Sequence, residues 1–426
     1  MGSIKIAKIA DPLADQVSEE IDTIRLRQKW IKGHLRALGR EEPLRVLIGS
    51  NSLACGGAEH QILRLMPQLI YLGLEVEHLY YGTPHFLKPQ FEDRGLCSYF
   101  LDRDAMGQWY FWKSAVSLIR QRAYDVVHAF SETANFYVRG AGAIARAPVL
   151  IAGWRNRIMD NRLKWRLPIS LLNMVSCSWV INATSNSEAL EKLWGMRRLR
   201  TYVVPNALEL SDRDYTVAET LDEELTAWIK GRMIVGAVGR IADQKNFDLF
   251  FDVAKRISAQ RQDVCFCLVG GPAGDSSTVA LDRHLRQRVE MEKLTGFVYI
   301  LGRSDNVAGF LPHISVLLCT SNFEGCPNAV IEGMRAGKPV VMTDCCNTEL
   351  LVEEGRSGYV VPLGDVETLS RQTNELLDDP EKCRRFGCYA HQLSEKHFRA
   401  ENSAWLMALI YIREWERFKQ RRRGRR

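Results

Sequence analysis

Two carboxylates, Glu324 and Glu332, lie eight residues apart and enclose the sequence Gly-Cys-Pro-Asn-Ala-Val-Ile. The apolar run 314–319 before them is typical of a buried parallel strand, and glycine and proline then break the chain before helix-forming residues resume. We therefore expect Glu324 in a loop at the carboxyl end of a strand, and Glu332 about one turn into a helix that starts near Asn328. Carboxylates beside the unpaired amide groups of a helix start suit a polyol phosphate.

The simplest alternative for Glu332 is an ion pair with Arg335, a common arrangement on exposed helix faces. The flanking glycines and prolines, which include Gly337-Lys338-Pro339, favour a ligand-binding loop instead. A carboxylate in such a loop contributes little to a core. We therefore expect the substitution Glu324→Ala to abolish activity and to leave folding nearly intact.

A basic pair lies about 80 residues before the acidic pair. Arg240 follows the strand-like residues 233–238, and Lys245 precedes a helix with apolar residues at helical spacing from Phe247 to Ala254. The two cations therefore lie at the amino end of that helix, where they can converge on one anion. Two solvated charges are the alternative interpretation. Together with the acidic pair, Arg240 and Lys245 are interpreted as a diphosphate clamp that faces a hydroxyl-binding loop.

A third element, Gly56-Gly57-Ala58-Glu59, follows the strand-like residues 44–48 and precedes the amphipathic segment 61–72. Glycines between a strand and a helix allow the backbone to approach a ligand closely. A tight turn is the alternative explanation for this glycine pair. We interpret Gly56 and Gly57 as a ligand-facing loop of the N-terminal half.

These motifs resemble those of glycosyltransferase family 4 (glycosyl transferases group 1), which are retaining nucleotide-sugar transferases with the two-domain GT-B fold. The similarity extends over roughly residues 44–415. Further short motifs in matching order carry it: Asp125-Val126-Val127-His128, Pro205-Asn206, Val238-Gly239, Gly302, Gly337-Lys338-Pro339-Val340-Val341, Gly355, Gly358-Tyr359-Val360-Val361-Pro362 and Gly364-Asp365.

The resemblance implies a role for each matching residue. Gly56 and Gly57 would lie against the phosphates of the donor. Arg240 and Lys245 would neutralise the leaving diphosphate, and such charge stabilisation is where most of the rate would come from. Glu324 would hold the hydroxyls of the donor sugar. The other implied donor-binding positions are Gly302, Gly325, Cys326, Pro327, Asn328 and, for the ribose, Glu332.

His128 matches the first histidine of a His-X-His pattern found in many family members, and the second position is Phe130. In those relatives the second histidine lies near the donor sugar and is often assigned a catalytic part. The replacement leaves three possibilities: His128 serves in catalysis, Ser131 or Glu132 supplies polarity, or the donor phosphate accepts the proton of the acceptor. We list His128 with Glu324, Arg240 and Lys245 as catalytic candidates. A structural role at a strand end is the alternative for His128.

The predicted fold class is α/β with GT-B architecture, two Rossmann-like domains whose parallel sheets face across an interdomain cleft. The 426 residues are enough for two domains with substantial cores, and alternating strands and helices indicate parallel sheets. The predicted domains are a helical extension (1–43), an acceptor-side domain (44–208), a linker (209–231), a nucleotide-sugar-binding domain (232–395), and a crossing helix with a basic tail (396–426). The predicted strands are 44–50, 74–80, 99–101, 125–128, 149–152, 180–183, 202–204, 233–238, 264–270, 299–301, 314–319, 339–342 and 358–361.

Eleven cysteines lack the paired spacing of a zinc site or a disulfide framework, and no signal peptide is visible. These features predict that the protein resides in the reducing cytoplasm. Asp102-Arg103-Asp104 has the form of the metal-binding Asp-X-Asp of another transferase fold, but two acids around an arginine are usually solvated. We predict no metal ion and no cofactor, with the nucleotide diphosphate sugar as the donor substrate.

The net charge of +6 is unevenly distributed, because arginines dominate Arg421–Arg426 and basic residues are frequent in 25–40. Such clusters attract an anionic membrane by about 1 kcal/mol per residue. Ile24, Ile31 and Leu35 approximate one helical stripe, so 25–40, and likewise the basic and aromatic stretch 154–166, are candidates to lie on a bilayer. A helix that covers the domain is the alternative for 25–40. No segment is long and apolar enough to span a membrane, and the predicted location is the cytoplasm, with peripheral association at the inner membrane.

The sequence thus predicts retaining, metal-independent transfer of a hexose from a UDP- or GDP-sugar to a glycan or lipid-linked glycan acceptor, in bacterial surface polysaccharide or glycolipid biosynthesis. A sugar-nucleotide epimerase on the same fold would work without an acceptor. A nucleotide-sugar-binding protein with impaired catalysis agrees with Phe130. A nucleic-acid-binding protein would need a basic face with aromatic stacking platforms, whereas the basic run is terminal, so we predict no nucleic-acid partner.

Overall fold

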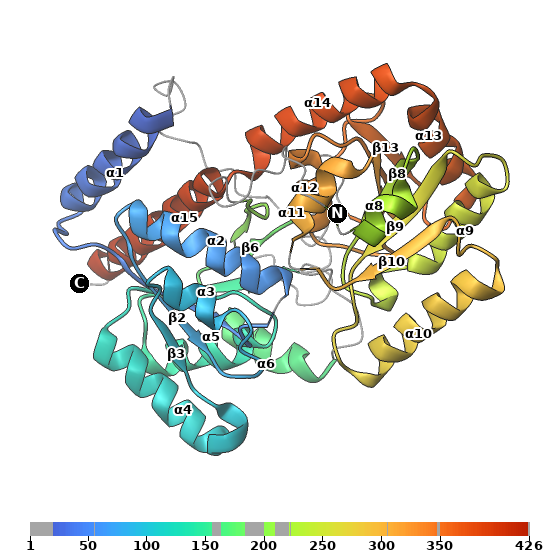
Figure 1. Cartoon of the computed structure of the whole chain (residues 1–426). Coiled ribbons are helices and arrows are strands. Elements are labelled where there is room, and N and C mark those ends of the chain that lie inside the picture. Colours follow the sequence, from blue (N-terminus) through green and yellow to red (C-terminus); the bar gives the residue numbers. More distant parts are fainter. Residues whose placement is uncertain are drawn as a thin grey trace, which may run out of the picture. The chain divides into compact units, whose positions relative to one another are not determined.

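The computed structural model describes residues 20–54, 56–155, 163–183, 200–208, 221, 223–304, 306–346 and 350–424. The chain divides into two compact units, each an α/β structure (Figure 1). The N-terminal unit is Met1–Ala207 together with Ala400–Arg426, and the C-terminal unit is Leu208–Arg399. The last helix of the chain therefore belongs to the N-terminal unit.

A parallel sheet of seven strands forms the centre of the N-terminal unit, in the order β3-β2-β1-β4-β5-β6-β7. Its strands are β1 (Arg45–Ser50), β2 (Glu75–Tyr80), β3 (Ser98–Phe100), β4 (Val126–Ala129), β5 (Val149–Trp154), β6 (Ser178–Ile181) and β7 (Arg200–Val203). Its described helices are α1 (Glu20–Ala37), α2 (Gly57–Tyr71), α3 (Lys88–Asp93), α4 (Arg103–Arg122), α5 (Ala134–Ala145), α6 (Leu163–Asn173) and α15 (Ala400–Arg423).

Alternating strand residues divide the core of this unit into two layers. Val46 and Val126 pack with α1, α2 and α15 on one face. Leu47 and Val127 pack with α4 and α5 on the other face. Both faces of the sheet are therefore covered, which explains why its strands are apolar throughout.

The C-terminal unit contains a parallel sheet of six strands in the order β10-β9-β8-β11-β12-β13. Its strands are β8 (Met233–Val238), β9 (Val264–Val269), β10 (Val298–Gly302), β11 (Val316–Cys319), β12 (Val340–Thr343) and β13 (Gly358–Val361). Its helices are α8 (Glu223–Ile229), α9 (Phe247–Ser258), α10 (Ser276–Met291), α11 (Val307–Phe310), α12 (Asn328–Arg335), α13 (Val366–Asp378) and α14 (Pro380–Phe398), with 3-10 turns η1 (Asp243–Lys245) and η2 (Leu311–His313).

Both sheets reverse their strand order beside their first strand, between β1 and β4 and between β8 and β11. Ligands of open parallel sheets bind at the carboxyl ends of the strands on either side of such a reversal. The segments that follow β8 and β11 carry Arg240, Lys245 and Glu324, and Glu332 lies in helix α12 after the second of them. The fold therefore places these residues where a ligand is expected.

The strands predicted from the sequence are all present in the two sheets, with ends that differ by a few residues. The predicted linker 209–231 lies largely outside the described residues. Within it, α8 is helical and Leu225 is buried in the core of the C-terminal unit. This end of the predicted linker is therefore part of the folded unit.

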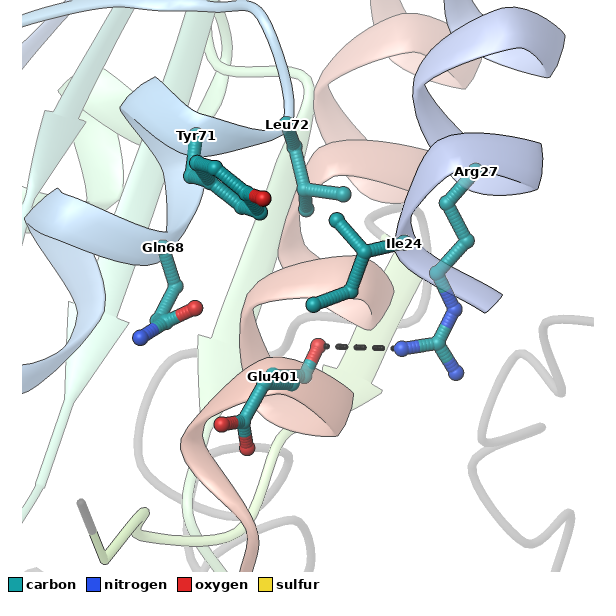
Figure 2. A pocket seen from close by; sticks show the side chains of 6 residues that line it. All are labelled: Ile24, Arg27, Gln68, Tyr71, Leu72 and Glu401. Carbon is teal, nitrogen blue, oxygen red and sulfur yellow. Dashed lines mark hydrogen bonds between the residues drawn. The ribbon is translucent and has the colours of Figure 1, made fainter. Parts of the chain in front are cut away.

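Helix α1 packs on the N-terminal unit, which agrees with the alternative of a helix that covers the domain; membrane association of 25–40 stays a prediction. Ile31 and Leu35 are buried in one core with α15, and the ring of Trp30 meets that of Trp405 edge-on at 5.6 Å. At the junction of α1, α2 and α15, Arg27 donates to the carbonyl oxygen of Glu401 (Figure 2). The stripe covers apolar surface of the unit because burial against protein removes it from water equally well.

Candidate active site

Glu324 lies in the loop after β11, as predicted, and the residue is buried. Its Oε1 accepts hydrogen bonds from Lys245 Nζ (2.6 Å) and Ser321 Oγ (3.0 Å). Its Oε2 accepts one from Gln244 Nε2 (3.0 Å), and its backbone N–H donates to the carbonyl of Cys345 after β12 (2.8 Å). Glu324 is therefore fixed by groups from three loops at one edge of the sheet.

Lys245 ends the η1 turn between β8 and α9, and its ammonium group is directed at Glu324. A Cβ atom on Gly239 would lie 3.0 Å from Lys245 Cε, so the glycine after β8 leaves the path for this side chain. Burial alone would lower the pKa of Lys245, but the charge of Glu324 and the hydrogen bond to it outweigh burial and raise that pKa. Lys245 is therefore charged at neutral pH.

The loops after β8 and β11 are joined by further hydrogen bonds. Thr320 Oγ1 donates to the carbonyl of Lys245 (3.1 Å), and the N–H of Asn322 donates to the carbonyl of Gln244 (2.8 Å). The ion pair consequently lies in a framework that is rigid before any ligand arrives, which is what electrostatic stabilisation of a transition state requires.

Arg240 follows Gly239 and is exposed. Lys245 forms an ion pair with Glu324, which the sequence interpretation did not include. Of the two predicted cations, Lys245 is therefore held in an ion pair, and Arg240 is exposed in the same loop after β8. The convergence of Arg240 and Lys245 on one anion stays a prediction.

Helix α12 begins at Asn328, as predicted, and Pro327 at its N-cap makes no side-chain hydrogen bond. Gly325 and Pro327 are buried, Cys326 is partly buried, and Glu332 is half-buried on the helix. Arg335, the alternative partner of Glu332, forms an ion pair with Glu395 of α14. Gly302 ends β10 with φ +80°, a conformation that favours glycine, and its carbonyl accepts from the N–H of Gly270.

Gly56 and Gly57 lie in the N-terminal unit, at the N-cap and the first residue of α2. A Cβ atom on Gly56 would lie 2.3 Å from Glu59 Oε2. The glycine therefore leaves space for the Glu59 carboxylate at the start of α2, where a negative charge is favourable. The Glu59 carboxylate therefore explains why a glycine is needed at position 56, in addition to the predicted ligand contact.

His128 in β4 is fully buried, and its Nδ1 is hydrogen-bonded to the hydroxyl of Tyr411 on α15 (2.8 Å). Burial and then the charge of Arg155 lower the pKa of His128 to about 3. The structure does not support the predicted catalytic role, because a neutral imidazole without solvent contact is a poor proton acceptor near neutral pH. The structural interpretation agrees better with this environment.

Three site residues were missed by the sequence interpretation. Gln244 and Ser321 both bond to Glu324, and their positions next to Lys245 and three residues before Glu324 could have indicated them. Tyr411 is 283 residues from its partner His128, and no local sequence pattern indicates this contact. Among the described residues, no group of His, Cys, Asp and Glu could hold a metal ion, and no helix combines the length and apolar character needed to cross a bilayer.

Comparison with known proteins connects both halves of the chain to one family. The model of "Glycosyltransferase Family 4" matches residues 55–212, and that of "Glycosyl transferases group 1" matches residues 232–379. Together they account for most of the chain. The residues of the Lys245–Glu324 pair lie in the second match.

Individual relatives are distant in sequence. The lipopolysaccharide core biosynthesis mannosyltransferase LpsB of Rhizobium meliloti is 24% identical over 42% of this chain and 51% of its own length. An Escherichia coli galactosyltransferase that acts on α-D-GlcNAc-diphosphoundecaprenol is 21% identical over 62% of this chain and 70% of its own. The chain spans 39% to 51% of the length of three of the curated relatives it matches.

Solved structures give a longer match. Anabaena Alr3699/HepE, solved in complex with UDP, superimposes with a TM-score of 0.70 at 19% identity, over 86% of this chain and 98% of the other. The similarity at this identity shows the fold, and two parallel α/β units are the GT-B architecture that the sequence predicts. The chain belongs to the family 4 glycosyltransferases (glycosyl transferases group 1) of GT-B fold.

Proposed function

We propose that this protein transfers a hexose, with retention of configuration and without a metal ion, from a UDP- or GDP-sugar to a glycan or lipid-linked glycan acceptor. The observation that carries the proposal is the buried Lys245–Glu324 pair at the strand-order reversal of the C-terminal sheet, between Gly239 and the start of α12. This is the place at which open parallel sheets bind nucleotides.

The chemistry of the pair agrees with donor binding. A carboxylate offers about four lone-pair directions, and three side-chain donors occupy Glu324. Glu324 can therefore accept one more hydrogen bond, from a sugar hydroxyl, and the position of its carboxylate is already fixed. Lys245 and the exposed Arg240 would supply positive charge to the diphosphate as it leaves, and such stabilisation is typically worth a few kcal/mol per group.

The relatives support a nucleotide-sugar donor and a surface-glycan acceptor. Structures of HepE contain UDP and UDP-glucose. The Rhizobium relative is named for lipopolysaccharide core biosynthesis, and the E. coli relative for a diphosphoundecaprenol-linked sugar. We extend these chemistries to this chain, with a place in bacterial surface polysaccharide or glycolipid assembly.

We also propose a cytoplasmic location with peripheral association at an anionic membrane. Arg421, Arg422 and Arg423 form the exposed last turn of α15. Arg25 and Lys29 are exposed on the face of α1 that points away from the core. The membrane role is thereby assigned to the charges of α1 and α15, since the apolar stripe of α1 is buried.

A binding screen tests the donor site. Purified protein is titrated by calorimetry with UDP, GDP, ADP and their sugar conjugates, alongside Glu324→Gln and the control Glu381→Gln, whose carboxylate is exposed in the same unit. We expect one nucleotide family to bind wild type and control alike, with sugar selectivity lost only in Glu324→Gln. Absence of binding to every nucleotide would contradict the proposal. Conversion of the sugar nucleotide without an acceptor would instead indicate an epimerase.

A further inference from the structure

The carboxyl edge of the N-terminal sheet carries a cation stacked on an aromatic ring. Phe130 follows β4, is fully buried, and donates its N–H to the carbonyl of Gly49 in β1 (2.8 Å). It therefore lies at the strand-order reversal of this sheet. The guanidinium of Arg155, the residue after β5, lies 4.2 Å from the centre of the Phe130 ring.

Arg155 is fixed by the neighbouring strand ends as well. Its Nη1 donates to the carbonyl of Val204 after β7 (3.1 Å), and its own carbonyl accepts from Asn182 Nδ2 after β6 (2.7 Å). The residue is 7% exposed. The ends of β4 and β7 thus contact the guanidinium, and the end of β6 holds the backbone of Arg155, so its orientation is set before a ligand binds.

Two observations indicate that this cation has a ligand-related role. The positive charge of Arg155 acts on a neighbouring group, because together with burial it lowers the pKa of His128. The hydroxyl oxygen of Ser131, next to Phe130, is buried and has no hydrogen-bond partner in the described structure. A fixed cation on Phe130 and an unsatisfied hydroxyl on the next residue both belong to the edge where parallel sheets bind ligands, and both are suited to an anion.

We infer that Arg155 binds a phosphate group of a substrate and that Phe130 positions it, an assignment that rests on the proposed function. A phenylalanine cannot exchange a proton or accept a hydrogen bond, but its ring face attracts a guanidinium. The planar fork of arginine matches phosphate oxygens. The phosphate comes either from the diphosphate of the donor or from a lipid diphosphate on the acceptor.

Calorimetric titration of the full-length protein tests this assignment. The probes are UDP and GDP for the donor, geranyl diphosphate for a lipid-linked acceptor, and geraniol as the same lipid without phosphate. The variants are Arg155→Gln and Phe130→Leu, which keeps an apolar side chain but removes the ring. The control is Arg120→Gln at the far end of α4, where an exposed guanidinium donates to the carbonyl of Ile144.

We expect Arg155→Gln to raise the Kd of one phosphate probe by about 10- to 100-fold, the effect of losing a charge-assisted hydrogen bond. Phe130→Leu should produce a smaller rise for the same probe, and Arg120→Gln none. Loss for geranyl diphosphate with UDP and GDP unchanged assigns the acceptor phosphate, and the reverse assigns the donor. A lower Tm with all Kd values unchanged shows a purely structural arginine and overturns the inference.

Failure of the proposed function is recognised separately. If no sugar nucleotide binds anywhere in the donor screen, the proposed transfer fails whatever Arg155 does. If geranyl diphosphate still binds and loses affinity in Arg155→Gln while geraniol does not bind, the phosphate site stands by itself. If the wild-type protein binds neither UDP, nor GDP, nor geranyl diphosphate, the inference about Arg155 is refuted.

Discussion

Breaking the Lys245–Glu324 pair should destabilise the C-terminal unit as well as stop transfer. This differs from the expectation, drawn from a loop position alone, that Glu324→Ala leaves folding nearly intact. The Glu324 side chain is 9% exposed and that of Lys245 18%, with Nζ and Oε1 2.6 Å apart. Removal of the carboxylate leaves a mostly buried ammonium group without its counter-charge.

The size of the effect follows from the burial of both groups. Loss of one partner of a fully buried pair costs about 3 to 5 kcal/mol, and the residual exposure of Lys245 lets water recover part of this. We therefore expect Glu324→Ala to lower the free energy of unfolding by about 2 to 4 kcal/mol. In the double variant Glu324→Gln with Lys245→Met, the combined loss should be smaller than the two single losses added, by about 1 to 3 kcal/mol.

Amide hydrogen exchange of peptides from β8, β11 and α12 is the suitable assay, because the two units can unfold separately. Glu381→Gln provides the control in the same unit, since the Arg384–Glu381 pair is exposed on both sides and should leave protection unchanged. Single losses that add to within about 0.5 kcal/mol would show that the two charges are not coupled. Unchanged protection in Glu324→Ala would refute the structural role of the pair.

Three further predictions concern acid stability, donor binding and the membrane. His78 and His128 are fully buried, with pKa values of about 3, so the folded state binds fewer protons than the unfolded state below pH 6.5. As the pH falls, each histidine should therefore lower the free energy of unfolding by about 1.4 kcal/mol per pH unit. A Tm of the N-terminal unit that stays constant from pH 7 to pH 5 would contradict this. Arg240→Ala should weaken UDP or GDP binding about tenfold through loss of one cation at the diphosphate, and an unchanged calorimetric Kd would argue against that contact. Deletion of Arg421–Arg426 should reduce sedimentation with anionic liposomes, with a difference that disappears at high salt; equal binding by both proteins would remove the tail from the membrane proposal.

Local sequence was sufficient for much of this protein. Apolar runs predicted the strands of both sheets, because residues buried on two faces must be apolar throughout. Glycine and proline after β11 predicted a loop at Glu324 and a helix start at Asn328, since both residues interrupt regular structure. These features depend on neighbours within about ten residues, and motif order along the chain then indicated the family.

Tertiary structure decided the partners of the functional side chains. Glu324 and Lys245 are 79 residues apart and meet because β8 and β11 are adjacent in the sheet. His128 and Tyr411 are 283 residues apart, and their hydrogen bond forms because the last helix packs on the first sheet. The same packing buries the apolar stripe of α1, which by sequence suits a membrane or a protein core equally. The reason is that burial and charge pairing depend on distance in space, which the order of the strands sets and the spacing of residues along the chain does not.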